Sequence, residues 1–168
     1  MKNILCLILT AALLFCLCGC EKGPGENEAI FYYPRMEFEF GSDQGVMVPE
    51  YHDVSGHTED LRYLISLYLR GPTNPELTLP FPSGTILVEL EETETELSVV
   101  LSSGIIALDP MDMITACGSL AQTCFAISDV EVVHISSLPS VSKQQVDMTF
   151  SRDSILLTGN EILPDITE

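Results

Sequence analysis

The sequence predicts an α+β fold in which two helices pack on one face of a small mixed β-sheet. Three observations predict it. Short runs of alternating or β-branched apolar residues recur along the chain, as is typical of strands. Two longer segments carry apolar residues at helical spacing and are bounded by capping residues. The elements follow one another in the order β-β-α-β-β-α-β, which indicates two helices on one side of a sheet.

The expected strands are residues 29–33, 45–51, 85–91, 96–102, 130–136 and a final short pair at 146–150 and 155–158. Residues 85–91 and 96–102 are joined by a short acidic turn, so they should form a hairpin. Thr58 is the candidate N-cap of the first helix, which should run to Arg70 and stop at Gly71. Asp109, followed by Pro, should cap the second helix, which runs to Ile127.

The second helix is apolar around most of its circumference, so other elements should cover most of it. Its polar face is narrow and consists of Asp112, Thr115, Ser119 and Gln122. Cys117 and Cys124 lie on the apolar side, two helical turns and about 10.5 Å of rise apart. A disulfide needs Cα atoms within about 7 Å. The two cysteines should therefore stay unpaired and pack in the core.

The first 19 residues predict an export signal. Lys2 precedes a run from Ile4 to Leu17 that is apolar except for Thr10, and polar, turn-forming residues follow. A basic start, a short apolar middle and small residues at the exit are the layout of a secretory signal peptide. The run is short for a membrane span, which needs about 20 apolar residues.

Cys20 is the predicted lipid-attachment site. The motif Leu17-Cys18-Gly19-Cys20 resembles the bacterial lipobox. The resemblance implies that the Cys20 thiol receives a diacylglycerol and that a peptidase cuts before it, so residues 1–19 are discarded. An uncleaved anchor and an ordinary signal peptide are the alternatives. Zinc binding by the C-x-C-x-C spacing is disfavoured, because no His or further Cys lies nearby to complete four ligands.

The composition restricts the partners of the chain. It carries 25 acidic and 7 basic residues, for a formal net charge of −18. Such a charge is repelled by nucleic acid and by anionic lipid headgroups. We therefore expect no nucleic-acid binding, and we expect membrane attachment to come from the lipid on Cys20. Residues 20–28 form a flexible tether before the first strand, and the eight of them that follow Cys20 reach at most about 28 Å when extended. The domain would be held close to the membrane.

The middle of the chain resembles the GerMN domain of sporulation and spore germination proteins. The resemblance rests on the order of four short motifs: YYP at 32–34, LISLYLRGPT at 64–73, LPFPSGT at 79–85 and LSVVLSS at 97–103. It covers residues 29–136, and the LPFPSGT turn has one residue more than the family pattern. Residues 137–168 form a C-terminal extension outside the resemblance, with a short hairpin expected in it.

The resemblance implies a fold similar to ring-building motifs and an extracytoplasmic, often lipid-anchored protein. It implies no catalytic residues, because the family has none established. Members of similar fold act by packing against protein neighbours. One copy of the domain is expected here, where some members have two.

The residues that could support chemistry are few. His52, Asp53, His57, Glu59 and Asp60 could form a metal site, but a polar loop that enters a helix explains the same residues. Glu89, Glu91, Glu92, Glu94 and Glu96 could attract calcium, but they lack the spacing and the Gly of a dedicated loop. His134 should be an exposed histidine near a strand end. The sequence contains no G-x-S-x-G nucleophile motif and no Gly-rich phosphate loop. We therefore assign no catalytic, cofactor or metal residue.

These observations favour a lipid-anchored, non-catalytic interaction module of the bacterial cell envelope, with sporulation or germination as the process that the resemblance implies. Its expected partners are the membrane, through the lipid, and other envelope proteins, and weak self-association is open. The first alternative is a lipoprotein that binds a small envelope ligand such as a peptidoglycan fragment. A deep pocket lined with aromatic residues would favour it. A hydrolase is the second alternative.

Overall fold

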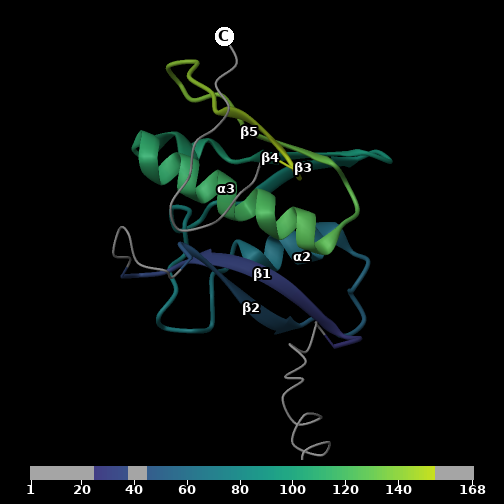
Figure 1. Cartoon of the computed structure of the whole chain (residues 1–168). Helices are drawn as coiled ribbons and strands as arrows, with labels where there is room; N and C mark the ends of the chain where they lie inside the picture. The colour runs from purple at the N-terminus through teal and green to yellow at the C-terminus, as the bar shows by residue number, and fades with distance from the viewer. Residues whose placement is uncertain (1–24, 38–44, 154–168) are drawn as a thin grey trace, which may run out of the picture.

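The computed structural model describes residues 25–37 and 45–153, which form three layers (Figure 1). A two-stranded sheet of β1 and β2 lies at the bottom of Figure 1, a four-stranded sheet lies at the top, and α2 and α3 lie between them. The described elements are β1 (Glu28–Pro34), β2 (Met47–Asp53), α2 (Leu61–Tyr68), β3 (Leu87–Glu92), β4 (Glu96–Leu101), the 3-10 helix η1 (Ser103–Ala107), α3 (Pro110–Ile127), β5 (Val132–Ser137) and β6 (Asp147–Ser151).

The α+β class and the order of the predicted elements are confirmed. The sheet differs from the expectation, because the described strands form two sheets and not one. β1 pairs with β2 in an antiparallel ribbon, and α3 packs against β1 on one side and β5 on the other. A helix that is apolar around most of its circumference needs cover on more than one side, and two sheets supply it.

The larger sheet has the strand order β3-β4-β5-β6. β3 and β4 form the predicted antiparallel hairpin, with a bulge between Leu87 and Glu89. β4 and β5 are parallel and are connected through α3, and β6 lies antiparallel to β5. The sheet is therefore mixed, as expected. The strand predicted at 155–158 lies outside the described residues, as do the signal peptide and Cys20.

The two helices begin at Asp residues. Asp109 accepts hydrogen bonds from the backbone N–H groups of Met111 and Asp112, which confirms the predicted cap of α3. For α2 the expectation was wrong at both ends. Asp60, and not Thr58, is the N-cap, and its carboxylate accepts from Tyr63 N–H at 2.9 Å. The regular helix ends at Tyr68, one turn before Gly71, whose φ of 100° favours glycine.

The core is shared by both sheets and both helices. Cys117 and Cys124 are unpaired and buried in it, as predicted. Other fully buried side chains include Phe31, Tyr33, Ile65, Tyr68, Leu97, Leu101, Ile105, Leu120 and Ile135. No helix in the described ranges is long and apolar enough to cross a membrane.

Candidate interaction surface

The free edge of β1 is closed by hydroxyl groups of α3. Tyr32 donates its backbone N–H to Thr123 Oγ1 at 2.9 Å, and Tyr32 O accepts from Ser119 Oγ at 2.6 Å. The Tyr68 hydroxyl lies 2.7 Å from Ser119 Oγ. Ser119 Oγ therefore links the Tyr68 hydroxyl to the backbone carbonyl of Tyr32. Ser119 and Thr123 are fully buried. The sequence placed Ser119 on the narrow polar face of this helix, and it is buried there because it bonds to the edge of β1.

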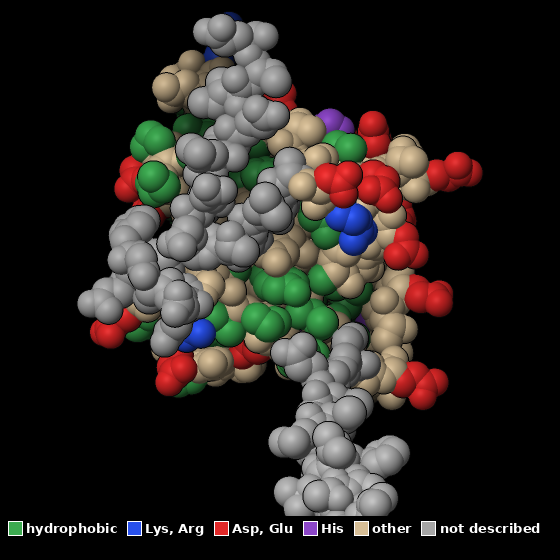
Figure 2. Space-filling view, in the orientation of Figure 1, with side chains coloured by type: hydrophobic (Ala, Val, Ile, Leu, Met, Phe, Trp, Pro, Cys, Tyr) green, Lys and Arg blue, Asp and Glu red, His purple; other side chains and the backbone are tan. Residues whose placement is uncertain are grey.

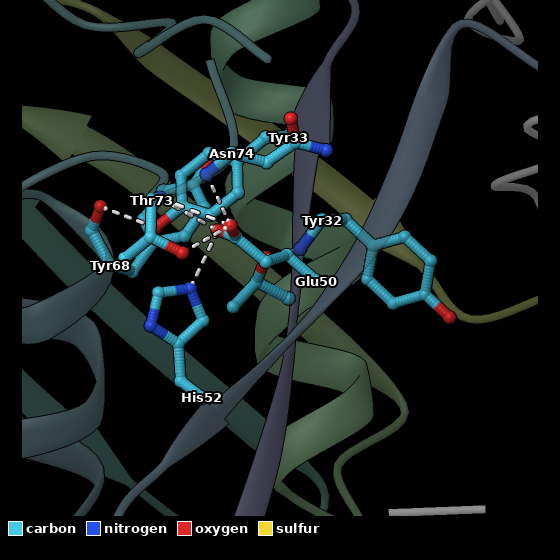
Figure 3. A network of polar contacts seen from close by, with 8 residues as sticks. Tyr32, Tyr33, Glu50, His52, Tyr68, Thr73 and Asn74 are labelled. Carbon is cyan, nitrogen blue, oxygen red and sulfur yellow. Dashed lines mark hydrogen bonds and ion pairs between the residues drawn. The ribbon is translucent and has the colours of Figure 1, made fainter. Parts of the chain in front are cut away.

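The ribbon is fixed to the α2–β3 connection by Glu50 of β2 (Figure 3). Its carboxylate accepts from Thr73 N–H at 3.0 Å, from Thr73 Oγ1 at 2.6 Å and from Asn74 N–H at 2.7 Å. His52 Nε2 lies 2.7 Å from the other oxygen. Burial raises the pKa of Glu50, but the hydrogen bonds from Thr73, Asn74 and His52 outweigh it, so the pKa is lowered.

Aromatic rings surround this carboxylate. The His52 ring lies 4.7 Å from the Phe31 ring, and Tyr33 stacks on Tyr68 at 4.8 Å between ring centroids. Tyr33 donates its hydroxyl to Tyr68 O at 2.9 Å. Burial raises the pKa of both tyrosines, so their hydroxyls stay protonated. Both carboxylate oxygens of Glu50 already have hydrogen-bond partners. We therefore interpret the network as a structural clamp and not as a catalytic site.

The five residues weighed as a metal site do not converge. His52 points to Glu50, while His57 stacks on Tyr63 at 4.0 Å. Asp60 caps α2, and its carboxylate lies 3.9 Å from His57 Nδ1. Within the described ranges, no group of three His, Cys, Asp or Glu side chains could hold a metal ion. A hollow of about 590 Å³ lies beside this loop and is lined by residues 56–61 and Glu92.

The four-stranded sheet has one covered and one open face. Its covered face carries fully buried side chains such as Leu97, Val99, Val133 and Ile135, which meet the helices. Alternation of side chains along paired strands puts the remaining residues on the other side. We call this side the open face; it consists of Glu89, Glu91, Glu96, Ser98, Val100, Val132, His134, Ser136, Asp147 and Thr149. No described helix packs on it (Figure 1).

The open face is acidic at its margin and carries small side chains at its centre. None of the six described strands contains Lys or Arg. His134 lies in the middle of β5 with its side chain 37% exposed, so it is exposed as predicted, although not at a strand end. Its Nδ1 is 3.0 Å from Thr149 Oγ1 and its Nε2 is 3.7 Å from a Glu96 carboxylate oxygen. Figure 2 shows acidic side chains along the side where the β3–β4 hairpin lies.

The calcium candidates lie in three places along the hairpin. Glu89 and Glu91 belong to the open face, whereas Glu92 is paired with Leu97 at the covered side. Glu94 lies in the hairpin turn, where Thr93 N–H donates to Glu96 O at 2.8 Å. The glutamates are thus spread along the hairpin and around its tip.

Comparison with known proteins shows which known fold this chain resembles. No family model matches the chain, and no curated protein matches it. Among solved structures, the tandem GerMN domains of the sporulation protein GerM from Bacillus subtilis match with a TM-score of 0.52 and 16% identity. The chain has a GerMN-like fold. The match covers 73% of this chain and 45% of the tandem protein, so the chain spans less than half of that neighbour.

A second solved structure is a candidate lipoprotein from Clostridium perfringens. It matches with a TM-score of 0.47 and 16% identity, over 75% of this chain and 87% of the other. The GerMN-like fold confirms what the motif order predicted. The saturated clamp at Glu50 and the buried hydroxyls of α3 were missed, because neither has a sequence motif. The spacing of four between Ser119 and Thr123 was the available signal for a polar stripe on one side of α3.

Proposed function

We propose that this chain is a lipid-anchored, extracytoplasmic and non-catalytic interaction module of the bacterial cell envelope. Sporulation or spore germination is the process to which we assign it, because the GerMN-like neighbour is described as a sporulation protein. The open face of the four-stranded sheet carries the proposal. It offers a surface of small side chains, Ser98, Val100, Val132 and Ser136, that another protein can approach closely.

The charge of the open face suggests the chemistry of its partner. Glu89, Glu91, Glu96 and Asp147 lie at its margin with no Lys or Arg on the strands. A partner with a basic surface would be attracted to this margin and repelled by few groups on it. Anionic lipid headgroups would be repelled by the same charges.

The proposed anchor at Cys20 supports the same function. β1 begins at Glu28, so the lipid and the domain would be separated by a short tether. Confinement near a membrane raises the effective concentration of a weak partner that is anchored in the same membrane. Figure 1 shows the four-stranded sheet on the side of the molecule opposite to β1 and β2. The open face would then be accessible from the side away from the first strand.

The anchor is tested by intact-mass measurement of the mature protein. The proposal requires a mature chain that starts at Cys20 and carries an acyl mass. The Cys20→Ser variant should accumulate as an uncleaved precursor without that mass. A mature chain that starts elsewhere, or a Cys20 without acyl mass, would contradict the anchor.

The interaction role is tested by crosslinking in intact cells. The anchored protein should give crosslinked species of higher mass. A form that carries Cys20→Ser and an ordinary cleavable signal peptide in place of residues 1–19 should lose most of them, because it is no longer confined to the membrane. If both forms give the same isolated monomer, and the purified domain instead hydrolyses an envelope substrate, the proposal is wrong.

A further inference from the structure

The groove between α2 and the edge strand β3 adjoins the open face but is lined by other residues. β3 is the first strand of its sheet and has a described strand on one side only, and α2 contacts it. The groove has a volume of about 280 Å³ and is lined by Ser66, Leu69, Arg70, Thr85, Ile86 and Leu87. It combines apolar side chains, an exposed cation and the backbone of an edge strand.

The backbone of β3 offers unpaired groups to this groove. Ile86 O accepts from Ser102 N–H at 3.0 Å, and Ile86 N–H donates to Ser102 Oγ at 3.2 Å. The backbone N–H and C=O of Ile86 therefore both point towards Ser102, which follows β4. In an antiparallel pair the next residue directs its groups to the opposite side. Leu87 therefore presents its N–H and C=O to the groove.

Arg70 is the cation of the groove. The chain has 25 acidic and 7 basic residues, yet Arg70 is exposed and makes no ion pair among the described residues. It lies beside the start of β3, near Thr85 and Leu87. Glu89, Glu91 and Glu92 follow towards the other end of the strand. The edge is therefore positive where β3 begins and negative where it ends.

Apolar surface is exposed beside these groups. Ile86 is 60% exposed and Val88 is 38% exposed, at the bulge before Glu89. A bulge at an edge strand limits uncontrolled pairing with other strands, because it interrupts the ladder. The part of β3 that stays available is short, and it lies next to Arg70.

We propose that this groove binds an extended peptide segment of a partner protein that ends in a carboxylate. The segment adds to the edge of β3, hydrogen-bonds to the Leu87 backbone and places an apolar side chain against Leu69 and Ile86. Its carboxylate pairs with Arg70. The charge order of the edge sets the direction: a carboxyl terminus at Arg70 makes the peptide antiparallel to β3, with its amino end near Glu91.

The probe is the pentapeptide Lys-Thr-Val-Thr-Val with a free carboxylate. It is titrated into the chain from residue 20 onward, carrying Cys20→Ser, and amide shifts are followed by NMR. We expect saturable shifts at Ile86, Leu87 and Arg70. Amidation of the peptide carboxylate should weaken binding about fivefold, the size of one exposed ion pair. A peptide with Pro at its central position should bind more weakly, because it lacks a backbone donor.

The matched protein variants are Arg70→Gln and Arg62→Gln. Both arginines are exposed, but Arg62 does not line the groove. Arg70→Gln should weaken binding of the free carboxylate about fivefold and should leave binding of the amidated peptide unchanged. Arg62→Gln should change neither. Absence of binding at millimolar peptide, shifts centred on the open face, or equal effects of the two variants would overturn the proposal. Failure of the peptide to bind the groove leaves the crosslinking test of the open face unaffected, because that test does not depend on Arg70 or on the peptide.

Discussion

The two sheets differ in how their edges and faces are closed. The β1–β2 ribbon is sealed on the side of α3 by Ser119 and Thr123, and Glu50 fixes it to the α2–β3 connection. The four-stranded sheet has one face on which no described helix packs and one edge beside a groove. The polar groups of the ribbon hold the fold together, whereas those of the open face have few partners among the described residues. Substitutions should therefore cost stability in the ribbon and cost binding on the open face.

The largest expected effect on stability is at Ser119. Ser119→Ala leaves the partly buried carbonyl of Tyr32 and the buried hydroxyl of Tyr68 without this partner, which should lower the free energy of unfolding by about 2–3 kcal/mol. Urea unfolding followed by circular dichroism measures it. Ser98→Ala on the open face is the matched control and should change stability by less than about 0.5 kcal/mol. Equal losses for the two serines would remove the distinction between the sheets.

A second variant separates the two bonds of Ser119. Tyr68→Phe removes the hydroxyl that lies 2.7 Å from Ser119 Oγ. In the Ser119→Ala background this change should cost less than in the wild type, because the hydroxyl has already lost its partner. Additive losses in the double mutant would show that the two groups do not interact in solution.

The clamp at Glu50 should have the next largest effect. Glu50→Gln keeps the size of the side chain but replaces one acceptor by a donor, which cannot accept from Thr73, Asn74 and His52 together. We expect a loss of about 1–2 kcal/mol in the free energy of unfolding at neutral pH. Glu89→Gln is the control on the open face and should stay within about 0.5 kcal/mol of the wild type.

The pH dependence of the clamp follows from its lowered pKa. The folded chain holds the pKa of Glu50 below the ordinary value of 4.5, so the ionised form stabilises the fold. This contribution is complete above the pKa of the unfolded chain and is lost as the pH falls through the folded pKa. The stability difference between wild type and Glu50→Gln should therefore shrink when unfolding is repeated at decreasing pH below 4.5. A difference that grows on acidification would contradict the clamp.

The core cysteines should have a smaller effect. Burial raises the pKa of both Cys117 and Cys124 to about 12, so the thiols stay neutral and unreactive in the folded chain. Cys117→Ser should cost about 1 kcal/mol, because it puts a hydroxyl among apolar neighbours. Reductant and chelator should leave the thermal midpoint unchanged. A large drop with either would reveal a disulfide or a metal that contributes to stability.

Much of the fold was predictable because local signals decided it. Asp109 with its following Pro and the end at Ile127 located α3, and the acidic turn located the β3–β4 hairpin. The start of α2 was not decided locally. Thr58 and Asp60 both precede the helix, and Asp60 is the residue whose carboxylate reaches Tyr63 N–H. Sequence periodicity does not decide between two candidate N-caps that are two residues apart.

The arrangement of the sheets depended on long-range contacts. Ser119 belongs to the narrow polar face of α3, but its partner Tyr32 is 87 residues away in the chain. Nothing in the pattern of α3 indicates that a strand edge will lie against it. Glu50 is likewise 23 residues from Thr73, and its role is visible only after β2 and the α2–β3 connection are placed together.

Site-specific photocrosslinking in cells tests the central claim, that the open face is where this protein meets its partner. A photoreactive amino acid is placed at Ser98 on the open face or at Ser55, an exposed serine directly after the ribbon. With the anchored chain, we predict a discrete crosslinked product from position 98 and none from position 55. The Glu89→Lys and Glu91→Lys substitutions should abolish that product and leave the fold unchanged. A product from position 55 alone, or equal products from both positions, would contradict the claim.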